Sequence, residues 1–188
     1  TRFMTASEGG TGGVDDVLVR RAAASVADGT SLSTGDARDV MAALMAGGVP
    51  DRDITDLLLG LRAKGETVDE VLGFLAAMRE AGTEVSGVGR VADIVGTGGD
   101  GHHSVNVSTM AAIVLASAGI PVVKHGNRAA SSKCGSADVL EALGVHINLG
   151  PDAVRACLAE VGIAFCFAPV FHPAMRHVGP VRRALGVP

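Results

Sequence analysis

The stretch VADIVGTGGDGHHSVNVST, residues 91–109, determines how the rest of this chain is interpreted. Its apolar run 91–95 predicts a buried strand, and the glycine-rich turn 96–101 follows directly. The polar stretch 104–109 then opens an apolar helix that we expect to run to Ala118. Glycines let the backbone approach an anion closely, and the N–H groups and dipole of a helix start attract negative charge. This order of elements is typical of a phosphate-binding site, although a tight strand-to-helix turn without a ligand would use the same residues.

The composition restricts the class of protein and its partners. The chain has 188 residues and is 47% hydrophobic, which suffices for one large or two small domains with a real core. Its net charge of −4 and its lack of Trp and Tyr argue against nucleic-acid binding. The cysteines 134, 157 and 166 lack metal-ligand spacing and fit a reducing cytoplasm. No apolar run approaches the length of a membrane span, so we expect no membrane contact.

The first part of the chain predicts a helical domain. Residues 1–13 are polar and glycine-rich, without a signal-peptide pattern, and we expect a flexible tail there. Helical spacing with start and stop signals then predicts four helices: 14–27, 34 to 47, 51 to 65 and 67 to 82. Short helices with short loops predict a bundle over residues 14–85, with a role in packing or dimerisation.

Two details of these helices are expected from local patterns. Ser33 or Thr34 and Asp51 are suited to cap the second and third helices. The run from Thr67 to Glu70 reads as a capping box for the fourth helix. The apolar face of that fourth helix is expected to consist of Val71, Leu72, Leu75 and Met78.

After a glycine-rich boundary or hinge at 82–90, the pattern changes. Expected strands at 91–95, 122–123 and 163–167 alternate with expected helices at 106–118, 136–143 and 151–161. Such alternation predicts a parallel sheet covered by helices. Ligands of these sheets bind at the carboxyl ends of the strands, where three loops should therefore meet. The loops are 96–104, 124–135 and 168–177.

The second loop, KHGNRAASSKCGS at 124–136, offers two or three cations together with hydroxyl, amide and imidazole groups. These groups suit a polyanion such as pyrophosphate. A solvated basic loop is the alternative interpretation. Two loops of this kind on one edge of a sheet favour the ligand.

The third loop leads into a helix that carries Arg182 and Arg183. Arg182 has the geometry to bind a carboxylate in a bidentate way, although helix arginines more often face solvent. His172 is equally well explained as a loop or cap residue. No Ser-His-Asp or Cys-His set, acid–base pair of carboxylates or metal-ligand spacing is apparent. The chemistry indicated is positioning and charge stabilisation around a phosphorylated ligand.

Five motifs in order carry a resemblance to a known family. They are GTGGD (96–100), NVST (106–109), KHGNRAASS (124–132), GSADVLEALG (135–144) and FAPVFHPAMRHVGPVRRALG (167–186). Together they resemble the anthranilate phosphoribosyltransferases of tryptophan biosynthesis, strongly over residues 91–188 and more loosely before them. The resemblance implies a glycosyltransferase that moves phosphoribose from phosphoribosyl pyrophosphate (PRPP) to the amine of anthranilate and releases pyrophosphate.

The resemblance also implies an architecture and a setting. The fold would be α/β, with an N-terminal all-helical domain and a parallel-sheet domain like that of nucleoside phosphorylases. The second domain would span 91–188, and helix 172–186 would pack back toward the helical domain. The family is cytoplasmic, uses Mg²⁺ and forms homodimers through the helical domain.

By motif position, the resemblance assigns site residues. The PRPP ligands would be Gly96, Gly99, Asp100, Ser104, Asn106, Val107, Ser108, Thr109, Lys124, His125, Gly126, Asn127, Arg128, Ala129, Ala130, Ser131, Ser132 and Ser136. Gly96, Asn127 and Arg182 would contact anthranilate, with His125 close by. Ser108 would be a Mg²⁺ ligand, and no residue is assigned as a general acid or base.

One departure from the family pattern is large. The family continues through further strands and an acidic Asp-Glu pair that holds Mg²⁺, whereas this sequence stops at Val187-Pro188. We therefore expect a fragment with an incomplete sheet and little or no activity alone. Smaller departures are Lys133-Cys134 and His102-His103.

Two other functions remain open at this point. A pyrimidine nucleoside phosphorylase has the same fold and a related Lys-His loop, but Asn127 and Arg182 favour anthranilate. A non-catalytic relative that binds nucleic acid or serves as a structural subunit fits the missing acidic pair, but not the acidic composition.

Overall fold

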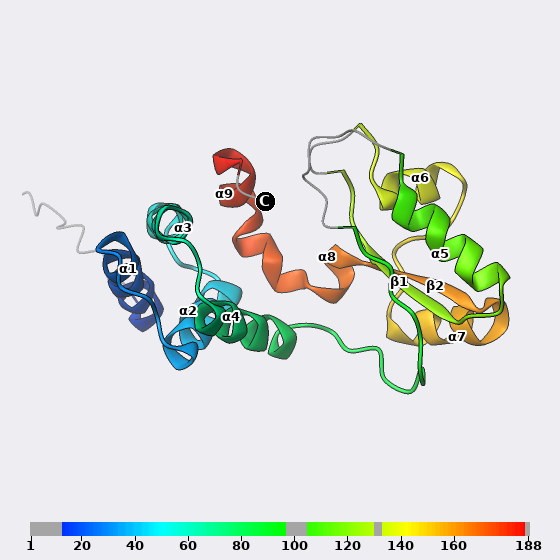
Figure 1. The fold of residues 1–188 in the computed structure, drawn as a ribbon, viewed down its shortest axis with the longest axis horizontal. Helices are drawn as coiled ribbons and strands as arrows, with labels where there is room; N and C mark the ends of the chain where they lie inside the picture. Colours follow the sequence, from blue (N-terminus) through cyan, green and yellow to red (C-terminus); the bar gives the residue numbers. More distant parts are fainter. Residues whose placement is uncertain (1–12, 97–104, 130–132, 187–188) are drawn as a thin grey trace, which may run out of the picture. The chain divides into compact units, whose positions relative to one another are not determined.

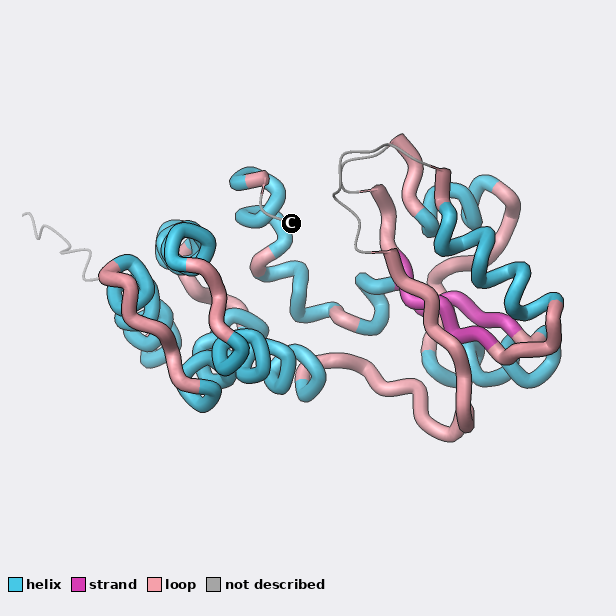
Figure 2. Tube along the Cα trace, in the orientation of Figure 1, coloured by secondary structure: helices cyan, strands magenta, loops and turns pink. Residues whose placement is uncertain are grey.

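The structure is a computed structural model that describes residues 13–96, 105–129 and 133–186 (Figure 1). It forms two compact units. The helical unit runs to Ala81 and resumes at His177, and the α/β unit extends from Gly82 to Arg176. Figure 2 shows that the two described strands belong to the α/β unit. The predicted fold class, a helical bundle followed by a parallel-sheet α/β domain, is confirmed.

The helical unit contains the helices α1 (Val14–Ala27), α2 (Thr34–Ala46), α3 (Asp51–Lys64), α4 (Val68–Glu80) and α9 (Gly179–Leu185). Helix α1 packs on α3, α2 packs on α4, and α9 packs on α3. Fully buried aliphatic side chains, among them Val19, Ile54 and Leu57, form the core. Gly13 is the N-cap of α1, and residues 1–12 of the expected tail lie outside the described residues.

The predicted caps are correct at two of three helices. Ser33 accepts a hydrogen bond from the Asp36 N–H, and Thr67 and Glu70 form the expected capping box. The prediction of Asp51 as a cap was wrong, because Pro50 is the N-cap of α3. The Pro50 carbonyl accepts the N–H groups of Asp53 and Ile54, and the fixed φ of proline suits a helix start.

The predicted apolar face of α4 is not the face that packs inside the helical unit. Val71, Leu72 and Leu75 are about half exposed, whereas Glu70, Gly73 and Ala77 are buried. A Cβ at Gly73 would lie 2.3 Å from the Thr34 carbonyl oxygen, so α2 and α4 approach each other backbone to backbone. Small residues permit this close approach, and the larger apolar side chains of α4 are therefore displaced from the α2 contact.

The α/β unit contains α5 (Val107–Ser117), β1 (Val122–Gly126), α6 (Ser136–Ala142), α7 (Pro151–Val161), β2 (Ile163–Phe167), α8 (Ala168–Phe171) and most of the 3-10 helix η1 (Pro173–His177). Strands β1 and β2 are parallel, with Val122 opposite Ile163 and Gly126 opposite Phe167. Their carboxyl ends are therefore level. Among the described residues, no helix is long and apolar enough to cross a membrane.

The side chains of β2 alternate between two clusters. Phe165 and Phe167 pack with Ala137 of α6 and Ile147. Ala164 and Cys166 pack on the other face with Val154 of α7. Figure 1 shows α6 and α7 on opposite sides of the strands. The period of two along β2 produces a sheet with both faces covered.

The predicted strand 91–95 is not a strand in the structure. It makes one bridge, between Ala92 and Val122, with bonds from Ala92 N–H to Pro121 O and from Val123 N–H to Ala92 O. Continued parallel pairing would join Ile94 N–H to Val123 O and His125 N–H to Ile94 O. Instead, the Asp93 carboxylate accepts the His125 N–H, and the Lys124 ammonium donates to Ile94 O. Side chains thus replace the backbone ladder after Ala92.

The predicted single helix 172–186 was wrong as well. The structure has α8 before His172, the 3-10 helix η1 after it, and α9 only from Gly179. Pro173 is the first residue of η1 and Pro180 is the second residue of α9, and proline lacks the N–H that a continuous helix requires.

Candidate functional site

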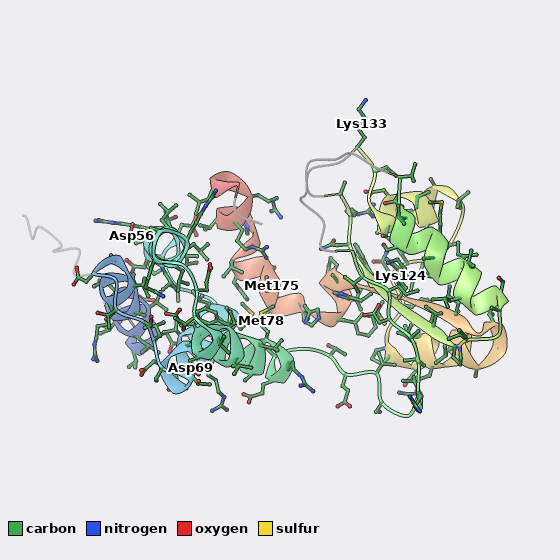
Figure 3. All side chains as sticks on the ribbon, in the orientation of Figure 1. Asp56, Asp69, Met78, Lys124, Lys133 and Met175 are labelled. Atoms are coloured by element: carbon green, nitrogen blue, oxygen red, sulfur yellow. The ribbon has the colours of Figure 1, made fainter. Side chains whose placement is uncertain are left out.

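Lys124 lies at the centre of the candidate site. It is the third residue of β1, and its side chain is buried among the elements of the α/β unit (Figure 3). Its ammonium donates to the Ile94 carbonyl at 2.7 Å and to the Ser108 hydroxyl at 3.1 Å. Burial lowers the pKa of this ammonium, and the nearby Asp93 carboxylate opposes that effect. Lys124 therefore joins the segment before the glycine turn to the first turn of α5.

His125, near the end of β1, contacts the segment that follows α8. Its ring meets that of His172, which follows α8, edge to face with 5.4 Å between the centroids. Its Nε2 is buried and has no hydrogen-bond partner among the described residues. Burial and the neighbouring His172 lower the pKa of His125, so the ring is neutral at neutral pH. A neutral ring with a free nitrogen suits contact with a ligand.

The starts of α5 and α6 are also joined. The buried Thr109 hydroxyl donates to the Ser136 hydroxyl at 3.0 Å. Both residues lie in the first turn of their helices, so two helix N-termini lie close together. A helix start has a positive dipole end that attracts an anion, and at α6 the Ala137 N–H is already bonded to the Asn127 carbonyl.

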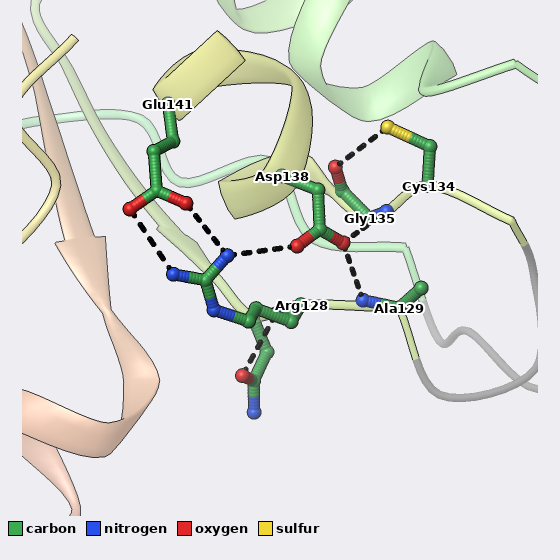
Figure 4. A network of polar contacts seen from close by, with 7 residues as sticks. Arg128, Ala129, Cys134, Gly135, Asp138 and Glu141 are labelled. Carbon is green, nitrogen blue, oxygen red and sulfur yellow. Dashed lines mark hydrogen bonds and ion pairs between the residues drawn. The ribbon is translucent and has the colours of Figure 1, made fainter.

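Arg128 is held on α6 by two carboxylates (Figure 4). Its guanidinium donates to Asp138 at 2.9 Å and to both oxygens of Glu141 at 2.8 and 3.1 Å. It also lies over the Phe167 ring, 5.6 Å from the centroid. The bonds to Glu141 and then Asp138 raise the pKa of Arg128. Two negative charges therefore offset its positive charge.

The structure joins some of the expected site residues that it describes. Hydrogen bonds link Lys124 to Ser108 and Thr109 to Ser136, and the His125 ring contacts His172. Gly96 lies near Ser108, since a Cβ at Gly96 would make ordinary van der Waals contact with the Ser108 hydroxyl oxygen at 3.9 Å. The remaining described PRPP residues, Asn106, Val107, Gly126, Asn127, Arg128 and Ala129, lie at the start of α5 or at the end of β1 and just after it.

Other expected residues do not enter this geometry. Gly99, Asp100, Ser104, Ala130, Ser131 and Ser132 lie outside the described residues. Arg182 lies on α9, in the helical unit, and makes no ion pair with any residue that the structure describes.

Sequence reasoning missed three acidic residues at the site. Asp93 was placed inside an apolar strand, and Asp138 and Glu141 were treated only as part of a helix. The spacing of Asp138 and Glu141, three residues apart, places both on one face of α6, where they reach the preceding basic loop. This spacing was the available signal.

The described residues contain no group of three or more His, Cys, Asp or Glu side chains able to hold a metal ion. The Ser108 hydroxyl is an available oxygen ligand, since it accepts one bond from Lys124 and keeps a second lone pair. One protein oxygen fits Mg²⁺ that is held mainly by phosphate oxygens and water.

Two family comparisons match the two units. Residues 88–188 match the family described as "Glycosyl transferase family, a/b domain". Residues 20–82 match "Glycosyl transferase family, helical bundle domain". The chain belongs to this glycosyl transferase family. The first match alone covers more than half of the chain, and the candidate site around Lys124 lies within it.

Individual members of the glycosyl transferase family are similar over most of this chain. Anthranilate phosphoribosyltransferase of Salinibacter ruber is 55% identical over 163 residues, which are 86% of this chain and 47% of the relative. The enzyme of Saccharopolyspora erythraea is 56% identical over 160 residues, or 85% and 46%. The chain thus spans about half the length of the curated relatives it matches.

Solved structures of family members give the same result. Anthranilate phosphoribosyltransferase from Thermus thermophilus has a TM-score of 0.80 and 50% identity, covering 89% of this chain and 51% of that one. The Saccharomyces cerevisiae enzyme in complex with PRPP and Mg has a TM-score of 0.82 and 26% identity, covering 92% and 52%.

Proposed function

We propose that this protein is an anthranilate phosphoribosyltransferase, which transfers phosphoribose from PRPP to the amine of anthranilate. One observation carries the proposal: Lys124 joins the segment before the glycine turn to Ser108, while Thr109 joins Ser136. Two helix starts and a buried ammonium are thereby combined at the carboxyl ends of β1 and β2. The relatives that match most of this chain are anthranilate phosphoribosyltransferases.

The proposed reaction breaks the bond between carbon 1 of the ribose and the pyrophosphate oxygen. Carbon 1 gains oxocarbenium character as pyrophosphate takes the bonding electrons. The N–H groups at the starts of α5 and α6 and the Lys124 ammonium stabilise the charge that develops on the leaving group. The amine of anthranilate attacks carbon 1 and then loses a proton, and its positioning in line accounts for much of the rate enhancement.

The proposed ligands follow from the resemblance. The PRPP set extends from Gly96 to Thr109 and from Lys124 to Ser136, as named above. Gly96, Asn127 and Arg182 would contact anthranilate, and the unpartnered His125 Nε2 supports a role for His125 nearby. Arg182 would pair with the substrate carboxylate. Its guanidinium is available for this role because it makes no ion pair with a described residue.

Mg²⁺ is proposed as the cofactor, with Ser108 as a protein ligand. When bound, it supplies positive charge that neutralises the departing pyrophosphate. Lys124 holds the Ser108 hydroxyl at the start of α5 and so fixes the ligand oxygen.

A homodimer through the helical unit is also proposed. Val68, Val71, Leu72 and Leu75 of α4 are between 50% and 75% exposed, which is unusual for neighbouring large apolar side chains. Sedimentation velocity should show a dimer, and Leu72→Glu with Leu75→Glu should produce a monomer with unchanged helix content. A monomeric wild-type protein would refute this proposal.

A cytoplasmic location is proposed from the thiols. Cys157 and Cys166 form no disulfide, and burial raises the pKa of the Cys166 thiol to about 11. Thiol titration of freshly isolated protein should find Cys157 and Cys166 as reduced thiols after denaturation. Oxidation of either one would count against a reducing compartment.

The function is tested by calorimetry with PRPP, with and without Mg²⁺. Lys124→Ala should weaken PRPP binding by about tenfold or more, because a charge-assisted contact contributes roughly 1.5–3 kcal/mol. Arg21→Ala is the control, since Arg21 is exposed, carries the same charge and lies on α1 of the helical unit. Arg182→Ala should leave PRPP binding unchanged and weaken use of anthranilate.

Two outcomes would overturn the proposal. The first is absence of PRPP binding by the wild-type protein. The second is phosphorolysis of uridine or thymidine in place of transfer to anthranilate, which would identify a nucleoside phosphorylase.

A further inference from the structure

Asp138 is bonded to both ends of the segment 129–135. One oxygen of its carboxylate, Oδ2, accepts the N–H of Ala129 at 3.0 Å and the N–H of Gly135 at 2.8 Å. The other oxygen accepts from the Arg128 guanidinium at 2.9 Å (Figure 4). The bonds to Ala129 and Gly135, followed by the one to Arg128, lower the pKa of Asp138. The carboxylate is therefore ionised at neutral pH and accepts three charge-assisted hydrogen bonds.

Close backbone packing accompanies these bonds. A Cβ on Gly135 would lie 2.3 Å from the Ala129 nitrogen and 2.5 Å from the Arg128 carbonyl carbon. The Ala137 N–H also donates to the Asn127 carbonyl at 3.2 Å. The chain before and the chain after this segment therefore lie against each other, and Asp138 holds them together.

We propose that Asp138 is a positioning residue for the phosphate site, acting through the backbone at 127–129 and 135–136. This inference rests on the proposed function and adds to it a residue that does not itself touch the ligand. By fixing Ala129 and Gly135, Asp138 sets the separation between the end of β1, which carries Lys124 and His125, and the helix start that carries Ser136.

A simple helix cap does not explain these contacts. Asp138 is the third residue of α6, and an ordinary capping interaction would reach back only to the N–H of Gly135. The bond to Ala129 reaches nine residues back in the sequence and joins a different limb of the chain. Because the N–H groups of Ala129 and Gly135 both donate to Asp138 Oδ2, this one oxygen holds the two limbs of the chain close together.

Arg128 belongs to the same arrangement. Since Asp138 and Glu141 offset its charge, Arg128 contributes to the site mainly by fixing the adjacent backbone. Glu141 binds only the guanidinium, whereas Asp138 binds the guanidinium and two backbone N–H groups. This difference provides a matched pair of variants on one helix.

The experiment compares Asp138→Ala with Glu141→Ala in the full chain. Both changes remove one carboxylate from α6 and one partner from Arg128. Asp138→Ala should accelerate hydrogen exchange of the Ala129 and Gly135 amides by tenfold or more and weaken PRPP binding by about tenfold. Glu141→Ala should change both quantities by less than about threefold. Asp138→Asn, which keeps an acceptor oxygen, should partly restore both.

The readouts separate positioning from general stability. Thermal unfolding of each variant is measured in parallel, and if Asp138→Ala lowers the midpoint, the comparison is made between Asp138→Asn and Glu141→Gln. If the wild type binds PRPP but the Asp138 and Glu141 variants have equal affinity for it, this inference is overturned and the proposed function stands. Failure of the wild type to bind PRPP overturns the proposed function, and the positioning role with it.

Discussion

Each unit of the molecule places a carboxylate at the third position of a helix, and the two carboxylates differ in what they hold. Glu70 of α4 is fully buried and accepts hydrogen bonds from the Leu32 N–H, from Lys64 and from Thr67. The Asp138 side chain on α6 is 29% exposed and accepts from Ala129, Gly135 and Arg128. A carboxylate at the same helix position therefore holds different parts of the chain in the two units.

The partners explain the difference. Leu32 lies just before α2, Lys64 ends α3 and Thr67 caps α4, so Glu70 joins three helices inside the core of the helical unit. Asp138 joins two limbs of irregular chain at the surface. A buried charge that loses its partners has a large energetic cost, whereas exposed pairs contribute little to stability. Glu70 should therefore determine stability, and Asp138 should determine local geometry.

The largest expected effect is that of Glu70→Gln on stability. The change leaves the buried Lys64 ammonium without its carboxylate, and we expect a loss of about 3–5 kcal/mol in the free energy of unfolding. Urea denaturation followed by circular dichroism measures it. Asp69→Asn, at the exposed neighbouring position, is the control and should change stability by less than about 0.5 kcal/mol. Equal losses in the two variants would contradict this role for Glu70.

The second effect is on the acid dependence of stability. Burial alone would raise the pKa of Glu70, but the bonds from Lys64, Leu32 and Thr67 outweigh it and lower this pKa to about 2 from 4.5. Since the folded-state pKa is the lower one, the stabilisation is fully present above the unfolded pKa and is lost as the pH falls toward 2. We expect a loss of about 3 kcal/mol in the unfolding free energy over that range.

Comparison with Glu70→Gln isolates this contribution. Urea titrations between pH 6 and pH 2.5 should show a smaller decrease in stability for the variant than for the wild type. Parallel curves would assign the acid sensitivity to other carboxylates.

Much of the fold could be predicted because local signals determine helix ends. Thr67 and Glu70 fixed the start of α4, and α7 has the expected bounds, Pro151–Val161. The parallel order of β1 and β2 followed from the alternation of strands and helices. These features depend on residues close together in the sequence, so a single sequence contains the information.

The errors come from contacts between distant residues. Nothing local to α4 indicates that Gly73 meets Thr34, and the apolar spacing of Leu72 and Leu75 therefore gave the wrong buried face. Similarly, Lys124 takes the Ile94 carbonyl that a strand would have used, so the segment 91–95 leaves the ladder after one bridge. At the site, the cations of 124–136 were recognised, but the carboxylates on α6 that hold Arg128 were not.

The smallest of the three effects tests the glycine contact that caused the wrong assignment of α4. Gly73→Ala would place a methyl group 2.3 Å from the Thr34 carbonyl and 2.7 Å from the Ala37 Cβ, so the two helices must separate. We expect a loss of about 1–3 kcal/mol in the free energy of unfolding, since overpacking a closed helix contact forces backbone shifts. Thermal or urea unfolding measures it.

Gly35→Ala on α2 is the matched control. A Cβ at Gly35 would have its nearest neighbour, the Ser33 hydroxyl, at 3.8 Å. Alanine is the better helix former by up to about 1 kcal/mol, so this variant should be neutral or slightly stabilised. Opposite signs for the two glycines would establish that α4 packs through its smallest residues. A neutral Gly73→Ala would mean that the helices have room to spare, and the apolar face predicted from the sequence would again be the better candidate for the packed side.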